Sequence, residues 1–311
     1  MRHGKWLVGL LVVTTMANGL VHPVVATAQM SETTAFLADL SNQYRVVPNV
    51  TYHEANNHEN KLDLYLPANT DGPVPVLMMI HGGGWVAGTK ESQLLRAMPY
   101  LEMGWAVVNV TYRLVQVSRA PAAVEDCVCA LQWIARNADT YNFDLSRVVT
   151  TGNSAGGHLA LTTGMVPTSA GLGRECTSAS FSGPSAVPEV DVAAIINWYG
   201  ITDVVDLTRG PNTKGYAVQW IGGLSNRNEI ARLTSPLTHV RKGLPPVLTI
   251  HGDADPIVPY QHAVRLHQAL DGVGVVNKLH TVPGGGHGGF STDETLEIYE
   301  TILGFLKQHG L

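Results

Sequence analysis

Short apolar runs alternate with longer amphipathic segments along most of this 311-residue chain, and this alternation restricts the possible folds more than any other feature. The nearly continuous apolar run at 74–80 has the pattern of a strand that is buried on both faces. The same pattern predicts strands at 105–110, 147–151, 192–198, 247–250 and 277–282, and helices at 92–103, 121–138, 154–164 and 260–270. Regular alternation of this kind predicts an α/β fold with a mostly parallel central sheet flanked by helices.

Both ends of this pattern depart from the alternation. The runs at 46–52 and 62–66 have no helix between them, so we expect an antiparallel hairpin at the edge of the sheet. At the other end, a capping-box pair precedes a final helix. We expect one face of that helix to carry Leu296, Tyr299, Ile302 and Phe305.

Two internal segments interrupt the alternation as well. Residues 166–190 are rich in Gly, Ser and Pro, and residues 203–240 are irregular, with short helices expected around Val218 and Ile230. We interpret both segments as small cap-like insertions over the ends of the strands. Residues 29–311 are accordingly predicted to form a single domain.

Residues 1–28 have the three parts of a secretory signal. Arg2 and Lys5 supply the positive start, an apolar run begins at Leu7, and the sequence ATA at 26–28 fits the small-x-small cleavage pattern. Polar residues interrupt the apolar run, which disfavours the alternative of a retained membrane anchor. We therefore expect a secreted or periplasmic protein without stable membrane insertion after the signal is cleaved.

Charge and hydrophobicity exclude two broad classes of protein. The chain is 45% hydrophobic and 14% charged, with a formal net charge of −5. A disordered chain needs low hydrophobicity and high charge, and a nucleic-acid binder normally carries a basic surface. We expect a compact enzyme that does not bind nucleic acid.

The three cysteines do not form a disulfide scaffold or a zinc motif. Cys127 lies on an apolar helical stripe, which predicts a core residue. In an oxidising compartment, Cys176 could pair with either Cys127 or Cys129.

The pentapeptide GNSAG at 152–156 has the form G-x-S-x-G. A predicted strand precedes it and a predicted helix follows it. A tight strand-to-helix turn requires small residues on both sides of the serine, and it places the Ser154 hydroxyl at a helix N-terminus, where negative charge is stabilised. An incidental serine in a glycine-rich turn would not require this context, so Ser154 is the candidate nucleophile.

A second glycine-rich segment, HGGGW at 81–85, follows the buried strand at 74–80. Three successive glycines allow the backbone to approach a ligand and to point N–H groups at it, as the oxyanion of acyl transfer requires. The alternative is a phosphate-binding loop, but no Gly-Lys-Ser/Thr follows and the G-x-G-x-x-G spacing fails.

Together the two motifs resemble those of the α/β-hydrolase family, and more narrowly its esterase and lipase branch with an HGGG-type loop. Three further segments fit the same resemblance: LDLYLP at 62–67, SAGGHLA at 154–160 and HGDAD at 251–255. The resemblance covers about residues 45–308. It implies the α/β-hydrolase fold and the chain order of nucleophile, acid and histidine.

The family pattern HG-x-x-D-x-x-V-P fits residues 251–259 with Asp255 as the acid and Asp253 as a turn residue. Asp253 as the acid would not fit this spacing. A metal site built from Asp253 and Asp255 is a further alternative, but it lacks other ligands nearby, so we predict no metal.

The expected histidine is His287, which follows the last predicted strand in the run GGGHGG at 284–289. Glycines on both sides suit a loop that must deliver an imidazole to the serine. The other histidines near these motifs are expected to be structural: His280 within a strand, His81 and His251 bonded to neighbouring loops, and His158 bracing the site.

The resemblance implies that His287 takes the proton of Ser154 and that Asp255 orients the imidazole. The oxyanion donors would be the N–H groups of Gly83, Gly84 and Ala155, and no metal or organic cofactor is needed. The sequence HEANNH at 53–58 is similar to a zinc-protease H-E-x-x-H, but it has one residue too many between the histidines, so we predict a loop.

The expected activity is therefore hydrolysis of carboxylic esters. The resemblance extends to bacterial secreted esterases of small-acyl, acetyl or feruloyl esters, whose substrates are small molecules or polysaccharide-linked esters. An amide, formamide or peptide hydrolase with the same triad stays open. A non-catalytic module is disfavoured because every triad position is filled, and a lipase because no apolar lid is evident.

The sequence does not decide which residues form the wall of the acyl pocket. Four aromatic residues are candidates either for this wall or for the core: Trp85, Trp198, Tyr199 and Trp220.

Overall fold

The computed structural model describes residues 31–176 and 190–311. The chain divides into two units, Met1–Asn42 and Gln43–Leu311. The first unit contributes all but the last residue of helix α1 (Glu32–Gln43). The predicted signal at 1–28 and most of the insertion at 166–190 lie outside the described residues.

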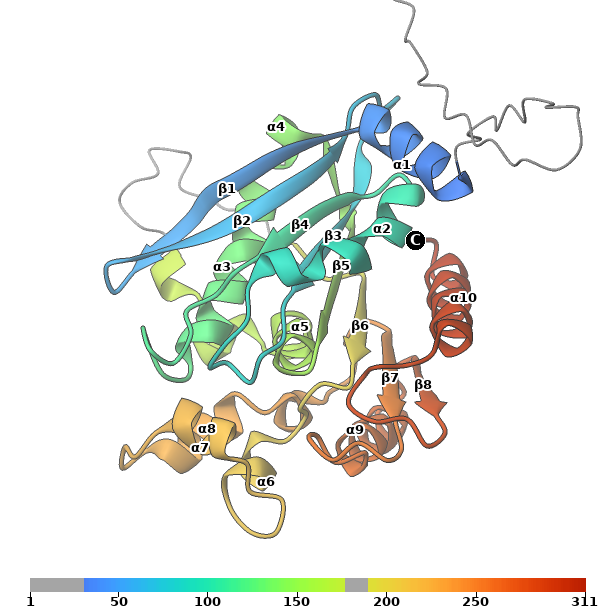
Figure 1. Ribbon diagram of the computed structural model, residues 1–311. Helices are drawn as coiled ribbons and strands as arrows, with labels where there is room; N and C mark the ends of the chain where they lie inside the picture. The colour runs from blue at the N-terminus through green and yellow to red at the C-terminus, as the bar shows by residue number, and fades with distance from the viewer. Residues whose placement is uncertain (1–30, 177–189) are drawn as a thin grey trace, which may run out of the picture. The chain divides into compact units, whose positions relative to one another are not determined.

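A sheet of eight strands is the framework of the second unit (Figure 1). The strands are β1 (Tyr44–Ala55), β2 (His58–Pro67), β3 (Val74–Ile80), β4 (Ala106–Val110), β5 (Phe143–Asn153), β6 (Ala194–Trp198), β7 (Val247–Gly252) and β8 (Asn277–Val282). Their order in the described sheet is β1-β2-β4-β3-β5-β6-β7-β8. β1 and β2 form the expected antiparallel edge hairpin, β2 also runs antiparallel to β4, and all later pairings are parallel. The mostly parallel sheet predicted from the alternation is confirmed.

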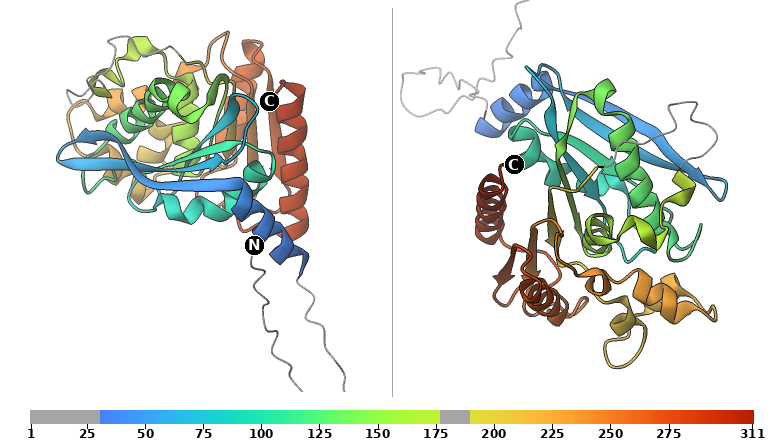
Figure 2. Two further views of the ribbon diagram at one scale, coloured as in Figure 1. Left: turned by 90° about the horizontal axis from the view of Figure 1, so that it is seen from above. Right: turned by 180° about the vertical axis from the view of Figure 1, so that it is seen from behind.

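Helices follow the strands as predicted. The longer ones are α2 (Leu94–Glu102), α3 (Ala122–Arg136), α5 (Ala155–Met165), α9 (Gln261–Gly272) and α10 (Thr292–Gln308). Figure 2 shows α3 and α5 together on one face of the sheet and α2 on the other. The shorter ones are α4 (Ala138–Tyr141), α6 (Val204–Thr208), α7 (Gly215–Ile221), α8 (Arg227–Leu233), and the 3₁₀ turns Lys90–Gln93, Thr168–Ala170, Arg174–Cys176 and Pro236–His239. The short helices expected in the 203–240 insertion are therefore present.

The core lies between the sheet and these helices. Every residue of β3 except Pro75 is buried, because helices cover both faces of this strand. Cys127 is buried in α3 as predicted, and the disulfide joins Cys129 to Cys176. The choice that the sequence left open is thus resolved in favour of Cys129.

Two predictions need correction in detail. Leu296 does not belong to the buried face of α10, since 59% of its surface is exposed, and the residues buried there are Ile298, Ile302, Phe305 and Leu306. A row of residues at i, i+3 drifts around a helix, so Leu296 and Phe305 lie about 180° apart. Residues 53–58 are not an irregular loop but the end of the β1–β2 hairpin, where Ala55 pairs with His58.

Candidate active site

Ser154 stands at the sharp turn between the end of β5 and the start of α5. Its φ of +56° is unusual for a residue other than glycine. The turn is closely packed, because a Cβ atom on Gly156 would lie 2.2 Å from the Ile80 carbonyl oxygen. The Ser154 N–H donates to the Trp198 carbonyl at 2.8 Å. Backbone contacts from β3 and β6 thus fix the position of this serine.

The structure brings Ser154, Asp255 and His287 together from three separate segments. His287 Nε2 lies 2.8 Å from Ser154 Oγ, and His287 Nδ1 lies 2.7 Å from Asp255 Oδ2. The Asp255 side chain is fully buried, whereas 19% of the His287 side chain is exposed. This geometry allows Nδ1–H to donate to the carboxylate and leaves Nε2 free to accept the serine proton.

Asp255 is held in its charged form by four hydrogen-bond donors. Oδ1 accepts from the N–H groups of Ile257 at 2.7 Å and Val258 at 3.0 Å, and Oδ2 accepts from His251 Nε2 at 3.1 Å as well as from His287. Burial alone would raise the pKa of this carboxyl group. The hydrogen bonds from the two histidines and from the Ile257 N–H outweigh burial, and the pKa of Asp255 lies well below its ordinary value.

Asp253 faces a different partner. Its Oδ1 accepts a hydrogen bond from the Gly284 N–H at 2.6 Å, so it ties the turn after β7 to the start of the histidine loop. The carboxylates of Asp253 and Asp255 are both engaged in hydrogen bonds. In residues 31–176 and 190–311, no group of three His, Cys, Asp or Glu side chains is arranged to hold a metal ion.

The HGGG loop lies beside the nucleophile turn because β3 and β5 are neighbours and Ile80 pairs with Gly152. Gly82 packs directly on Asn153, with only 2.7 Å between its Cβ position and the Asn153 carbonyl oxygen. Gly83 and Gly84 have φ values of +116° and +61°. Among the described residues, no acceptor takes the N–H of Gly83 or Gly84.

The third expected oxyanion donor, Ala155, is the first residue of α5. Its N–H therefore has no acceptor within the helix. Gly83, Gly84 and Ala155 thus lie on two adjacent segments whose backbone N–H groups are available to a ligand.

Two buried histidines near the site, His81 and His158, each bond a backbone carbonyl group. His81 Nδ1 donates to the Gly82 carbonyl at 2.7 Å, and His158 Nε2 donates to the Thr234 carbonyl at 2.6 Å. Burial lowers the pKa of each of these histidines to about 4. Both are therefore neutral at pH 7, and both keep their places as hydrogen-bond donors.

The four aromatic candidates for the acyl-pocket wall are buried. Trp85 and Trp220 stack on each other with ring centroids 4.0 Å apart, and His158 packs edge-on against both of them. Trp198 and Tyr199 are also buried, at the end of β6. Of the two interpretations that the sequence allowed, core packing is correct for Trp85 and Trp220, whereas Tyr199 packs against the His287 imidazole.

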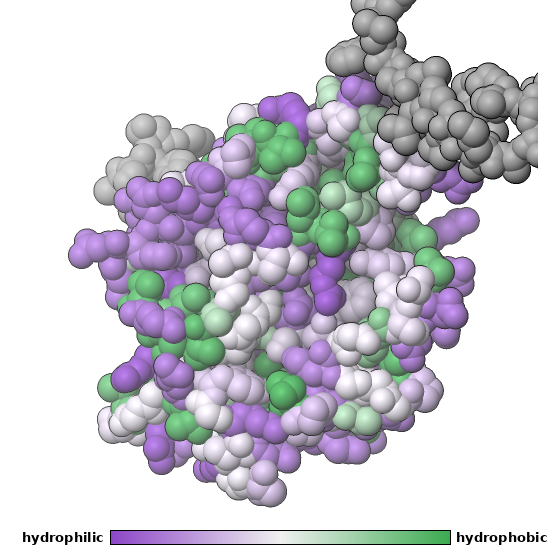
Figure 3. Space-filling view, viewed as in Figure 1, coloured by the Kyte–Doolittle hydropathy of each residue, from purple (hydrophilic) through white to green (hydrophobic). Residues whose placement is uncertain are grey.

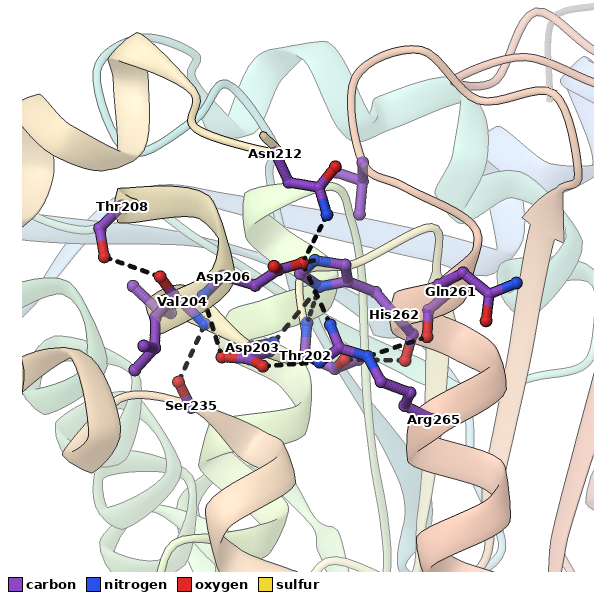
Figure 4. Close-up of polar contacts among 12 residues, drawn as sticks. Thr202, Asp203, Val204, Asp206, Thr208, Asn212, Ser235, Gln261, His262 and Arg265 are labelled. Atoms are coloured by element: carbon purple, nitrogen blue, oxygen red, sulfur yellow. Dashed lines mark hydrogen bonds and ion pairs between the residues drawn. The ribbon is translucent and has the colours of Figure 1, made fainter. Parts of the chain in front are cut away.

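A polar cluster ties the insertion at 203–240 to α9 (Figure 4). His262 Nδ1 accepts from the N–H groups of Thr202 at 3.2 Å and Asp203 at 3.3 Å, while its Nε2 donates to Asp206 at 3.1 Å. Arg265 bonds to both aspartates. Burial and the adjacent Arg265 charge lower the pKa of His262 to about 4, which preserves the neutral form that this arrangement needs.

The insertion also reaches the site itself. Lys214 Nζ donates to the Pro256 carbonyl at 2.8 Å, next to the Asp255 turn. The Tyr216 ring lies within 3.1 Å of the Cβ position of Gly84. The start of α7 therefore lies between the glycine loop and the acid turn.

The residues that sequence reasoning missed are supporting partners of the triad. His251 was expected to bond a neighbouring loop, and it also donates to the Asp255 carboxylate. The motif HG-x-x-D held this information, since His251 and Asp255 are both part of it. The Trp198 carbonyl and the Tyr199 ring had no comparable signal.

A cavity of about 670 Å³ lies away from the triad. It is lined by α3, α5 and residues 172–174 and 190–192. No triad residue lines it, so the triad and not this cavity locates the candidate site.

On the face seen in Figure 3, hydrophobic residues lie in separate groups among hydrophilic ones, which is ordinary for a protein surface. No helix in the described part of the chain has the length and apolar character needed to cross a bilayer.

Comparison with known proteins finds a matching family model and several esterases that are similar to this chain. The BD-FAE family model matches residues 62–270. The esterase LipC of Mycobacterium tuberculosis is 28% identical over 70% of this chain and 53% of its own length. The isoprenylcysteine alpha-carbonyl methylesterase ICME of Arabidopsis thaliana is 26% identical over 73% of this chain and 48% of its own length. The chain spans about half the length of the curated relatives it matches.

Solved structures cover the chain more completely. A truncated form of carbohydrate esterase from gut microbiota is 28% identical, with a TM-score of 0.70, over 86% of this chain and 97% of that one. A thermophilic esterase of Thermogutta terrifontis, 24% identical with a TM-score of 0.67 over 84% of this chain and 91% of its own, has the same fold. The chain therefore has the α/β-hydrolase fold that its motifs predicted.

Proposed function

The chain belongs to the BD-FAE family, and on that premise we propose that it is a serine-dependent hydrolase of carboxylic esters. The observation that carries this proposal is the unbroken hydrogen-bonded line from Asp255 through His287 to Ser154 beside the HGGG loop. The esterase relatives and the carbohydrate-esterase neighbour support it.

The reaction begins when His287 Nε2 takes the proton of Ser154 as Oγ attacks the ester carbonyl. The imidazole then carries a positive charge. Asp255 stabilises this charge because its own pKa is far below neutrality and it stays ionised at every working pH. His287 next gives the proton to the departing alcohol, and the acyl group remains on Ser154.

The backbone N–H groups of Gly83, Gly84 and Ala155 receive the oxyanion of the tetrahedral intermediate. In the second half of the reaction, water attacks the acyl-enzyme and His287 Nε2 takes the proton of that water. The proton then passes to Ser154 Oγ as the acid product leaves, which restores the enzyme. His287 transfers every proton in these steps.

We further propose that the substrates are small-acyl, acetyl or feruloyl esters, either free or linked to polysaccharide. The carbohydrate-esterase neighbour supports this choice. The buried positions of Trp85 and Trp220 exclude them as contacts for the acyl group. Tyr216 lies between the glycine loop and the acid turn, and its hydroxyl donates to the carbonyl of the exposed Ile257 in that turn at 3.4 Å. These two side chains are the proposed contacts for the acyl group.

Cleavage after Ala28 and a secreted or periplasmic location are also proposals. The disulfide between Cys129 and Cys176 supports them, because disulfides persist in oxidising compartments. N-terminal sequencing of protein recovered from an exporting host tests cleavage, and a mature chain that still began at Met1 would contradict it.

A panel of p-nitrophenyl esters of increasing acyl length, with methyl ferulate and acetylated xylan alongside, tests the activity. We expect ester hydrolysis that Ser154→Ala reduces by roughly 10⁴–10⁶-fold in kcat. A matched anilide should react far more slowly than the ester. Faster anilide hydrolysis would instead favour the amide-hydrolase alternative, and ester turnover that Ser154→Ala left intact would refute the serine mechanism.

A further inference from the structure

The loop that carries His287 has few side chains of its own to hold it in place. Five glycines surround the histidine in the run 284–289. The Cβ positions of Gly284, Gly286 and Gly289 have no atom within 4 Å, so side chains at these positions would have no packing partners. Glycine-rich backbone loses the most conformational entropy on ordering. An imidazole on such a loop needs support from elsewhere in the molecule.

Tyr199 supplies a wall against this loop. The centroids of its ring and the His287 imidazole are 4.7 Å apart, and Phe290 packs edge-on against Tyr199 at 6.0 Å. The Tyr199 hydroxyl lies 2.8 Å from the Cβ position of Gly288, so a larger residue there would strike it. Tyr199 thus contacts His287, Gly288 and Phe290. Tyr199 itself is buried, with only 3% of its surface exposed.

Tyr199 is itself held firmly. Its N–H donates to the Ile250 carbonyl at 2.7 Å, and its hydroxyl accepts a hydrogen bond from Arg96 Nη2 at 3.2 Å. The Arg96 guanidinium in turn lies 5.6 Å from the centroid of the Trp198 ring. The φ of Tyr199 is +39°, a strained value for an aromatic residue. Strain of this kind persists where the surroundings impose it, and it concentrates at functional sites.

The segment formed by Trp198 and Tyr199 supports both halves of the triad. The Trp198 carbonyl accepts the N–H of Ser154 at 2.8 Å, and the next side chain packs against His287. One dipeptide at the end of β6 therefore sets the nucleophile and the base relative to each other.

We propose that Tyr199, held by Arg96, is a positioning residue that keeps the His287 imidazole in place while the enzyme is acylated. This inference rests on the proposed function. In the free enzyme, His287 is held at Nδ1 by Asp255 and at Nε2 by Ser154. Once Ser154 Oγ carries the acyl group, it has no proton to donate to Nε2. The Tyr199 wall and Asp255 then hold the imidazole that must activate water, so loss of Tyr199 slows deacylation more than acylation.

Pre-steady-state release of p-nitrophenol from p-nitrophenyl acetate separates these two steps. In Tyr199→Leu we expect deacylation to slow roughly 50-fold and acylation by no more than roughly 5-fold, since small misplacement of a catalytic group costs up to 10²-fold. The variant should show a burst close to one equivalent per active site. Its kcat and KM should both fall, while kcat/KM, which reports acylation, should change little.

Two milder variants test the Arg96 contact. Tyr199→Phe keeps the ring and loses the hydroxyl, and Arg96→Met loses the donor, so each should slow deacylation by roughly 3-fold. The double variant should be no slower than either single one, because both remove the same hydrogen bond. These variants also keep the inference testable if Tyr199→Leu does not fold. Tyr299→Phe is the matched control, since it removes a nearby hydroxyl from a ring that packs on Trp198, and we expect wild-type rates.

Three results would overturn the inference. Equal slowing of both steps in the Tyr199 variants would indicate a general structural role. A raised KM with unchanged kcat would make Arg96 and Tyr199 substrate contacts, and unchanged kinetics in Tyr199→Leu would remove any role. If the wild type shows no p-nitrophenol release and no acylation of Ser154, the proposed function itself fails, which is a different outcome from all three.

Discussion

The nucleophile turn and the histidine loop are both rich in glycine, but the glycines play different structural roles in the two segments. At the turn, Cβ atoms on Gly152 and Gly156 would lie 2.5 Å and 2.2 Å from backbone atoms. In the loop, Gly284, Gly286 and Gly289 have open space around their Cβ positions. The turn is thus fixed by close approach of backbone to backbone. His287 itself is held by hydrogen bonds and by the ring of Tyr199, which directly follows β6. The Gly285 carbonyl oxygen of its loop also lies close to β7, 2.2 Å from the Cβ position of Gly252.

This difference explains why the two regions should respond differently to change. A closely packed turn tolerates no added atom, and substitution there costs folding. A loop held by a few polar contacts can lose one of them and keep its fold, but the reaction then suffers. The predictions below test this distinction, beginning with the largest expected effect.

Asp255→Asn should lower kcat by on the order of 10⁴-fold, because an amide favours the wrong tautomer of His287. Thermal denaturation should show that the variant still folds. Asp253→Asn is the matched control, since its partner is the Gly284 N–H and not the imidazole, and it should lower kcat far less. The reverse ranking in steady-state assays would show that the acid has been misassigned.

Gly156→Ala should destabilise the protein by at least about 3 kcal/mol, because the new methyl group meets the carbonyl oxygens of both Ile80 and His81. The free energy of unfolding from urea titration measures this loss. A variant as stable as the wild type would mean that close packing does not fix the nucleophile turn.

Lowering the pH from 7 to 4 should weaken the nucleophile region before it affects Asp255. His81 and His158 have pKa values of about 4 in the folded protein against 6.5 in the unfolded chain. Between these values the unfolded state binds protons that the folded state does not, so stability falls as the pH drops, by up to about 1.4 kcal/mol per histidine and pH unit.

The same titration distinguishes buried histidines, among them His262 with its pKa of about 4, from the Asp255 carboxylate. The pKa of Asp255 is lowered, so its contribution is lost only below the ordinary carboxyl pKa of 3.8. His158→Gln, which keeps a donor toward the Thr234 carbonyl, should flatten the decline in unfolding free energy between pH 6.5 and 4. A wild-type stability that was constant over this range would contradict the assignment of neutral buried histidines.

Gly286→Ala should have the smallest effect, within about 0.5 kcal/mol of the wild type, because this glycine has no positive φ and its Cβ position is open. Urea titration of this variant beside Gly156→Ala compares the two regions directly. Equal destabilisation by both substitutions would remove the distinction between them.

The sequence predicted the sheet and the order of its helices, and it singled out three side chains that the structure brings together, because each of these is encoded locally. Ser154 and Asp255 lie in short motifs whose spacing reflects a turn, and His287 follows the last strand. The supporting contacts depend on distant segments: Arg96, Tyr199 and Gly288 meet only when three elements pack together. No pattern in one segment could predict that meeting. Leu296 was predicted wrongly for a related reason. Its spacing fitted one face of the helix, but the face that packs against the rest of the protein is a different one.

The central claim is that Ser154 is a nucleophile that His287 activates. A p-nitrophenyl alkylphosphonate that reacts with activated serines, followed by peptide mass spectrometry, tests it most directly. We predict one adduct per chain in the wild type, on the peptide that contains Ser154. Ser154→Ala should take up no label, and His287→Ala should react orders of magnitude more slowly. Equal labelling of Ser154→Ala, or an adduct on another residue in the wild type, would contradict the account.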